Sequence, residues 1–239
     1  MDRNIVAIGG GGFSDTGRLT GIEREVATLA RRADGRLRVC YVPTAGGDQQ
    51  EDVALFRRAW AGTATDVSVL TLFRRDVDDI TALLREQDLI FVGGGAASNL
   101  MALWQLHGVV GAMRAAYRAG VFLAGVSAGA ICWHAHGITT TFSADRPVAV
   151  GGLGLVDATF CPHWQVPARH RALEEHLLKA GGVGFGCDDH GAIHYVNGRP
   201  QRELQDADGV RVAYLRVEGD AVVEEPLRRG PLPADLIEP

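Results

Sequence analysis

The segment Val121-Phe-Leu-Ala-Gly-Val-Ser-Ala-Gly-Ala130 decides the fold of this chain. Its first four residues are apolar and predict a strand buried on both faces, as in a parallel sheet. Gly125-Val-Ser-Ala-Gly129 then matches the G-x-S-x-G pattern of a nucleophile elbow, a sharp strand-to-helix turn that exposes one hydroxyl. We expect residues 130–134 to continue as the helix. The alternative interpretation is a turn of small residues that only packs a helix close to the sheet.

The composition is that of an ordinary globular protein. Of 239 residues, 46% are hydrophobic and 22% charged, and the formal net charge of −5 does not favour a nucleic-acid partner. No apolar run approaches the roughly 20 residues that span a bilayer. The N-terminus shows no signal-peptide pattern. We therefore expect a cytoplasmic protein with no nucleic-acid or membrane partner, formed by a single domain over residues 1–239 with an irregular tail at 226–239.

The four cysteines are far apart in the sequence and form no C-x-x-C pair. Each lies in or beside an apolar segment, where a free cysteine behaves as a small hydrophobic residue. The sequence therefore predicts four reduced, buried cysteines: Cys40, Cys132, Cys161 and Cys187.

Strands alternate with helices through the first half of the chain. Apolar runs predict strands at 4–9, 37–42, 67–72 and 89–92, and helical spacing predicts helices at 22–33, 51–60, 76–84, 99–106 and 109–119. This alternation indicates the α/β class, with a doubly wound, mainly parallel sheet covered by helices on both faces.

Ligands of such sheets bind at the carboxyl ends of the strands. We therefore expect the loops at 9–12 and 93–95 to lie with the elbow at one sheet edge. The first loop lacks the third glycine of a dinucleotide fingerprint, since Ser14 or Asp15 stands there. It is interpreted as a glycine loop beside an active site.

Beyond the elbow the pattern loosens. A polar, glycine-rich connection at 139–154 suggests a hairpin. The remaining expected elements are strands at 155–160, 184–187 and 192–196, a helix at 169–180, and a C-terminal β-hairpin formed by 209–217 and 221–225.

A serine hydroxyl needs a base to take its proton, and the base needs a third group to orient it. His163 follows a strand directly and could meet Ser127 at the sheet edge. His134 and His136 are expected on the helix after the elbow, and the helix would carry His134 away from the serine. The alternative interpretation of His163 is a structural residue at a strand end.

The orienting acid should lie on another loop at the end of a strand. Asp188 and Asp189 follow the strand expected at 184–187, although both could be solvated turn residues. Asp157 is too close to His163 along the same strand. The resulting order, Ser…His…Asp, differs from the Ser…Asp…His order of the α/β-hydrolases.

The oxyanion donors would be the N–H of Ala128 and one N–H from the triple glycine, with Gly94 and Gly95 as the candidates. A run of three glycines permits the backbone to approach a ligand closely.

A family resemblance covers residues 4–198. The segments Val92-Gly-Gly-Gly95, Gly125–Ala130 and Pro162-His163, with the acid Asp189, resemble the peptidase E (aspartyl dipeptidase) family, which includes cyanophycinases and has a class I glutamine amidotransferase-like fold. The resemblance implies that Ser127 is the nucleophile, His163 the base and Asp189 the acid. Better-known members have a glutamate at that last position, and Asp188 stays an alternative.

Two departures from the family concern the substrate. Ala96-Ala97 replaces the usual Asn-Thr after the triple glycine, and the segment after His163 is shorter than in the aspartyl dipeptidases. Those enzymes bind an N-terminal aspartate through an arginine from that segment. The resemblance makes Arg169 and Arg171 the candidates, since a guanidinium suits a carboxylate. Two solvated charges at a helix start are the alternative.

The resemblance implies a serine exopeptidase, a dipeptidase or aminopeptidase, that hydrolyses the N-terminal peptide bond of short peptides, with Asp-X dipeptides as candidate substrates. A Ser-His-Asp triad and an acyl-enzyme would carry the reaction without a metal or organic cofactor. A cyanophycinase-like or esterase hydrolase, or a non-enzymatic ligand-binding relative, are the alternatives. A short peptide is the expected partner, and a homo-oligomer is compatible with the sequence.

Overall fold

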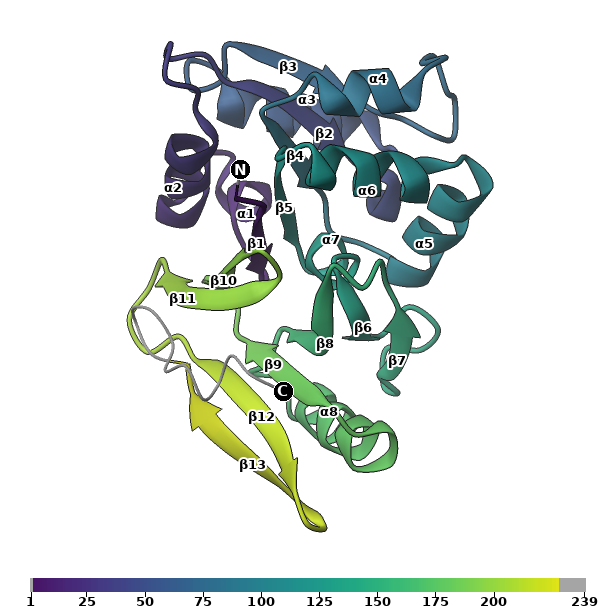
Figure 1. Ribbon diagram of the computed structural model, residues 1–239, viewed down its shortest axis with the longest axis vertical. Helices are drawn as coiled ribbons and strands as arrows, with labels where there is room; N and C mark the ends of the chain where they lie inside the picture. The colour runs from purple at the N-terminus through teal and green to yellow at the C-terminus, as the bar shows by residue number, and fades with distance from the viewer. Residues whose placement is uncertain (1, 228–239) are drawn as a thin grey trace.

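The computed structural model describes residues 2–227, and it contains two β-sheets with helices packed around them (Figure 1). The first sheet consists of β1 (Asn4–Ile8), β2 (Arg38–Val42), β3 (Asp66–Val69), β4 (Leu89–Val92), β5 (Phe122–Val126), β10 (Gly191–Val196) and β11 (Arg199–Gln205). Its strand order is β11-β10-β1-β5-β4-β2-β3. The strands β1 to β5 are parallel, and the antiparallel strands β10 and β11 extend the β1 edge. The mainly parallel sheet is therefore confirmed.

Helices cover both faces of this first sheet. The two faces of β1 show the arrangement, because alternate side chains of a strand point to opposite sides. Ile5 and Ala7 belong to one hydrophobic cluster with residues of α4 (Ile80–Arg85), α5 (Ala97–Leu106) and α6 (Val109–Arg118), whereas Val6 and Ile8 belong to a second cluster with residues of α2 (Gly21–Ala30) and α3 (Gln50–Trp60). The doubly wound α/β class follows from this layering (Figure 1).

The second sheet lies beside the first and was not predicted as a separate sheet. It consists of β6 (His134–Thr139), β7 (Val148–Gly151), β8 (Val156–Pro162), β9 (Val183–Cys187), β12 (Val212–Glu218) and β13 (Ala221–Pro226). Its order is β13-β12-β9-β8-β6-β7, with β6, β8 and β9 parallel. The helix α8 (Pro167–Ala180) packs on it through Leu173 and Leu177. The predicted C-terminal hairpin is present as β12–β13. The hairpin suggested at 139–154 is formed by β6 and β7, but β6 ends where that segment begins.

The helix expected over 130–134 is wrong in extent. The structure ends α7 (Ala128–Ile131) one turn after the elbow, and His134 and His136 lie on β6. The cause is tertiary pairing, because the carbonyls of Cys132 and Trp133 accept hydrogen bonds from the N–H groups of Leu153 and Leu155. A continued helix would take those carbonyls away from the second sheet.

Other element boundaries have local causes. The helix α4 begins at Ile80, later than expected, because the Asp79 carboxylate caps it by accepting the Ala82 N–H at 2.9 Å. The helix α8 begins two residues earlier than expected, with Pro167 at its first position, where a missing N–H costs nothing. The tail predicted at 226–239 lies outside the described residues from 228 onward, and Pro226 ends β13.

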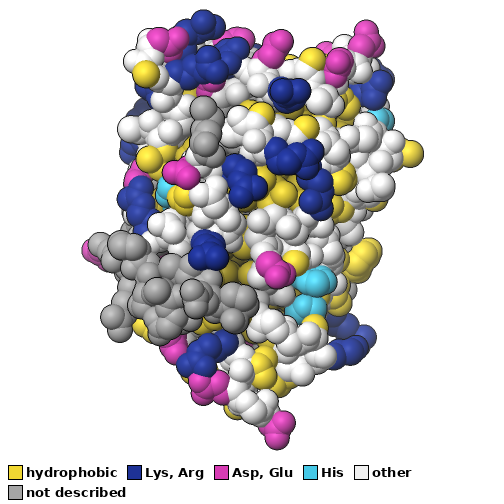
Figure 2. Space-filling model, in the orientation of Figure 1, with side chains coloured by type: hydrophobic (Ala, Val, Ile, Leu, Met, Phe, Trp, Pro, Cys, Tyr) yellow, Lys and Arg dark blue, Asp and Glu magenta, His cyan; other side chains and the backbone are white. Residues whose placement is uncertain are grey.

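All four cysteines are buried and unpaired, as predicted. Over residues 2–227, no helix combines the length and apolar character needed to cross a membrane. On the face shown in Figure 2, Lys and Arg side chains form several groups separated by polar, acidic and hydrophobic side chains.

Candidate active site

The backbone at Ser127 has the strained geometry of a nucleophile elbow. Ser127 lies between β5 and α7 with φ 53° and ψ −110°, a region that residues other than glycine rarely adopt. Its N–H donates to the carbonyl of Ile8 on the neighbouring strand at 2.9 Å. This hydrogen bond joins the elbow to the end of β1, and the turn presents the serine side chain beyond the sheet edge.

The two glycines of the G-x-S-x-G pattern are required by close packing. A Cβ on Gly125 would lie 2.2 Å from the carbonyl oxygen of Gly129, and a Cβ on Gly129 would lie 2.2 Å from the carbonyl oxygen of Val92. Both distances are far below van der Waals contact. The first turn of α7 therefore packs directly against the backbone of β4 and β5, which fixes the direction of the serine.

Ser127, His163 and Asp189 form a continuous line of hydrogen-bonding atoms. The Ser127 Oγ lies 2.9 Å from His163 Nε2, and His163 Nδ1 lies 2.6 Å from Asp189 Oδ1. An ionised carboxylate can only accept, so Nδ1 carries the proton that faces Asp189. In the neutral imidazole, Nε2 then has the free electron pair, and it accepts the hydrogen bond from the serine hydroxyl. This is the tautomer that a general base needs.

A glutamine holds the acid in place from both sides. The Gln165 amide nitrogen donates to Asp189 Oδ2, and its amide oxygen accepts the Asp189 backbone N–H at 3.1 Å. Gln165 is two residues after His163, so one short segment contacts the acid twice. Sequence reasoning missed Gln165, although its position beside the Pro-His pair was a usable signal.

The neighbouring Asp188 points elsewhere. It is buried, and its Oδ2 accepts hydrogen bonds from the Arg211 backbone N–H at 3.0 Å and from Arg211 Nε at 3.3 Å. Arg211 directly precedes β12, so Asp188 connects β9 to the C-terminal hairpin. Of the two acids that the sequence left open, the structure brings Asp189 to His163.

The site is assembled from two sheets, whereas the sequence predicted one edge of a single sheet. Ser127 and the glycine loops follow strands of the first sheet, while His163 and Asp189 follow β8 and β9 of the second. Backbone hydrogen bonds join the sheets at this point, because the His163 N–H donates to Gly9 at 3.3 Å and the His190 N–H to Gly10 at 3.0 Å. The glycine loop at 9–12 thus lies beside the candidate active site, as predicted.

The candidate oxyanion donors Gly94 and Gly95 line the same cavity as Ser127, and Ala128 follows the serine in sequence. Ala128 is the first residue of α7, where a backbone N–H has no acceptor within the helix. A Cβ on Gly94 would lie 3.7 Å from the Ser127 Cβ. Gly95 has φ 134°, and a Cβ there would lie 2.1 Å from the carbonyl oxygen of Ala45. The glycine run is therefore packed between the residues after β2 and the elbow.

Neither candidate substrate arginine is brought to the serine. Arg169 is buried, and its guanidinium donates to the Ile138 carbonyl at 2.9 Å and to Thr140 Oγ1 at 3.1 Å. Burial lowers the pKa of Arg169. Arg171 is exposed on α8. Neither residue lines the cavity above Ser127.

His134 is a structural residue of the core. Its Nδ1 lies 2.9 Å from the Ala130 carbonyl and its Nε2 3.1 Å from the Tyr195 hydroxyl. A carbonyl only accepts, so Nδ1 donates, and the neutral ring then accepts the tyrosine O–H at Nε2. Burial lowers the pKa of His134 to about 3. The ring is therefore uncharged at neutral pH.

A cavity of about 330 Å³ opens above the serine and histidine. Asp15, at the short helix α1 (Phe13–Thr16), and Asp52, in the first turn of α3, line it together with Tyr41 of β2. Sequence reasoning missed Tyr41 and Asp52, because their positions match an ordinary strand and helix. Within residues 2–227, no group of three or more His, Cys, Asp or Glu is arranged to hold a metal ion.

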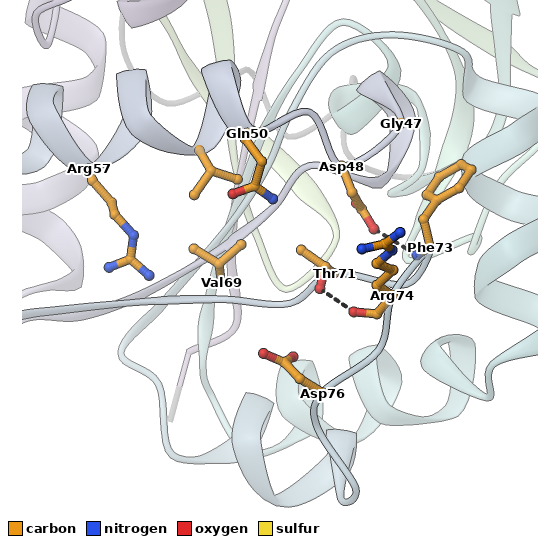
Figure 3. Close-up of a pocket in the computed structure, with 10 residues that line it drawn as sticks. Gly47, Asp48, Gln50, Arg57, Val69, Thr71, Phe73, Arg74 and Asp76 are labelled. Atoms are coloured by element: carbon orange, nitrogen blue, oxygen red, sulfur yellow. Dashed lines mark hydrogen bonds between the residues drawn. The ribbon is translucent and has the colours of Figure 1, made fainter.

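A larger cavity of about 540 Å³ lies elsewhere on the molecule (Figure 3). Ser127, His163 and Asp189 are not among the residues that line it. Its wall includes Asp48, whose Oδ2 accepts the Phe73 backbone N–H at 2.9 Å and also that of Leu72. Asp48 thereby joins the loop after β2 to the loop after β3. This role of Asp48 is structural.

The family match defines the class of this protein as a peptidase with an α/β fold. The model of peptidase family S51 matches residues 5–202, and the chain belongs to that family. It is 32% identical over 230 residues to the uncharacterized peptidase YgaJ of Bacillus subtilis (strain 168), covering 94% of this chain and 97% of that protein. It is 27% identical to peptidase E of Streptomyces coelicolor, covering 90% and 84% of the two chains.

Two solved structures share the fold. A peptidase from an acI-B1 Actinobacterium superposes with a TM-score of 0.65 at 18% identity, covering 95% of this chain and 94% of that one. A putative peptidase E protein from Listeria monocytogenes EGD-e gives a TM-score of 0.59 at 19% identity, covering 91% and 100%.

Proposed function

We propose that this protein is a cytoplasmic serine exopeptidase that hydrolyses the N-terminal peptide bond of short peptides. The observation that carries the proposal is the line of contacts from the Ser127 hydroxyl through His163 to Asp189, at a cavity also lined by the triple glycine. Membership of peptidase family S51 supports the peptidase class.

In this mechanism, Ser127 Oγ attacks the first carbonyl carbon of the peptide while His163 Nε2 takes the hydroxyl proton. Asp189 stabilises the imidazolium that forms. The Ala128 N–H and one N–H of the Gly94–Gly95 pair donate to the oxyanion, and loss of one such donor typically costs about 10²–10³ in rate. His163 then protonates the leaving amine, and water hydrolyses the acyl-enzyme by the reverse proton path.

The first residue of the substrate depends on what lines the cavity. A preference for an N-terminal Asp requires a cationic side chain in the cavity. The Arg169 guanidinium instead donates hydrogen bonds to the Ile138 carbonyl and to Thr140 Oγ1. Asp-X dipeptides therefore belong in the substrate panel as one class among several. Cyanophycin and short esters belong there too, because they separate a peptidase from the other hydrolases that the sequence allows.

The test compares wild type with Ser127→Ala on a panel of dipeptides and aminoacyl-nitroanilides. We expect hydrolysis by wild type, a loss of at least about 10³-fold in kcat/KM for the variant, and labelling of wild type alone by a fluorophosphonate. A variant that hydrolyses peptides like wild type contradicts the proposal. So does a wild-type protein that turns over only cyanophycin or esters, or one that the reagent does not label.

A further inference from the structure

The cavity above Ser127 is acidic. Asp15 and Asp52 line it, and no Lys or Arg is among its lining residues in the described part of the chain. Asp52 is half-buried in the first turn of α3, whereas Asp15 is exposed at α1. A carboxylate in the first turn of a helix also interacts favourably with the helix dipole. The two acids alone therefore do not identify a ligand.

A second, independent feature lies in the same wall. Tyr41 is 4% exposed, its ring stacks on Phe56 at 4.1 Å between centroids, and a Cβ on Gly93 would lie 2.7 Å from its hydroxyl oxygen. Within residues 2–227, that hydroxyl has no hydrogen-bond partner. Because Tyr41 lines the cavity, this hydroxyl is available to hydrogen-bond a polar group of a ligand there.

Tyr41 is a neutral hydroxyl in this setting. Burial, followed by the negative charges of Asp52 and Asp48, raises its pKa above the ordinary value. The protonated phenol presents an oxygen that can accept a hydrogen bond. The Tyr41 hydroxyl oxygen and the Asp52 carboxylate are thus two hydrogen-bond acceptors in one wall. Together they favour a ligand group that only donates hydrogen bonds, such as an ammonium.

The position of Asp52 fits an ammonium close to the reacting carbonyl. Gly46 lies between Asp52 and the triple-glycine loop. A Cβ on Gly46 would be 3.0 Å from Asp52 Oδ2 and 3.5 Å from the Gly94 carbonyl oxygen. In a peptide attacked at its first carbonyl, the α-nitrogen is two bonds from the reacting carbon, about 2.5 Å away. A free N-terminus bound for reaction is therefore near this wall.

We propose that Asp52 and the Tyr41 hydroxyl bind the free α-ammonium of the peptide substrate. This inference rests on the proposed function and names the substrate group that makes the enzyme an exopeptidase. Asp15 adds negative charge at the cavity mouth. The same charges repel an acidic first side chain, so the enzyme prefers neutral or basic N-terminal residues over Asp.

The test uses Ala-Leu and propionyl-Leu, which differ by the α-ammonium alone. In wild type, we expect kcat/KM for Ala-Leu to exceed that for propionyl-Leu by at least about 100-fold. Asp52→Asn should lower this ratio at least tenfold, mostly through a higher KM, and Tyr41→Phe should lower it by about threefold to tenfold. Glu51→Gln is the matched control, because Glu51 shares the first turn of α3 but is exposed to solvent. It should keep the wild-type ratio.

Binding to the inactive Ser127→Ala protein gives a second readout. Calorimetry should show Ala-Leu bound at least tenfold more tightly than propionyl-Leu, and the added Asp52→Asn change should remove the difference. An Asp52→Asn ratio equal to wild type overturns the inference. The inference is also overturned if Asp52→Asn lowers kcat/KM for acetyl-Lys-Leu but not for Ala-Leu. Asp52 would then bind a cationic side chain and not the α-ammonium.

Failure of the inference is distinguishable from failure of the function. If wild type cleaves propionyl-Leu as well as Ala-Leu and Ser127 is labelled by the fluorophosphonate, the peptidase stands and the ammonium subsite is wrong. If the wild-type protein neither cleaves peptides nor reacts with the reagent, and Ser127→Ala binds neither ligand, both are overturned.

Discussion

A Cβ on Gly10 would lie 1.8 Å from Oδ1 of Asp189, so the loop after β1 packs directly against the acid of the candidate triad. The same Cβ would lie 2.7 Å from His163 Nδ1. The hydrogen bond between histidine and acid therefore exists only because residue 10 has no side chain. This contact makes the first glycine loop part of the site without giving it a reacting group.

Gly10→Ala should therefore inactivate the enzyme. The methyl group must displace either Asp189 or His163, and we expect kcat to fall by about 100-fold or more with little change in KM. Gly111→Ala is the matched control, because nothing lies within 4 Å of a Cβ at this position in α6. It should leave kcat unchanged and add roughly 0.5–1 kcal/mol of stability. Steady-state kinetics and thermal unfolding measure both outcomes, and a fully active Gly10→Ala enzyme contradicts the packing argument.

The two adjacent acids should respond differently to the same change. Asp189→Asn offers an amide donor to His163 Nδ1, which favours the wrong tautomer, and we expect kcat to fall by about 10²–10⁴-fold. Asp188→Asn keeps an oxygen that accepts from Arg211, so its activity should stay within about threefold of wild type. Kinetics on one dipeptide decide the matter. The reverse pattern would assign the role of the acid to Asp188.

Stability should fall in mild acid because of His134. Its pKa is about 3 in the folded protein and 6.5 in an ordinary environment, so the unfolded chain takes up the proton first as the pH falls. The stabilising contribution is complete above about pH 6.5 and is lost progressively toward pH 3. At pH 5 the loss from this one group amounts to about 2 kcal/mol.

Urea unfolding at pH 7 and pH 5 measures this effect. His134→Asn should be less stable than wild type at pH 7, since it loses hydrogen bonds to Ala130 and Tyr195. Its loss of stability between the two pH values should nevertheless be smaller by about 2 kcal/mol. A variant with the wild-type pH dependence would show that the His134 ring is not held neutral.

The local patterns of the sequence determined much of the first sheet. Apolar runs placed β1, β2, β4 and β5 within one or two residues, because strands buried on both faces need continuous apolar sequence. The G-x-S-x-G pattern located the elbow, since the close approaches at Gly125 and Gly129 admit no side chain. His163 and the acids at 188–189 were found as residues that follow strands.

Tertiary structure alone decided how these parts meet. The second sheet, the end of α7 at Ile131 and the choice of Asp189 over Asp188 depend on pairing between segments distant in sequence, and no local pattern encodes such pairing. The acidic wall at Tyr41 and Asp52 arises in the same way, from a strand and a helix that each show only ordinary periodicity. The sequence determined which groups are available, and the joining of two sheets at Gly9 and Gly10 determined which of them come into contact.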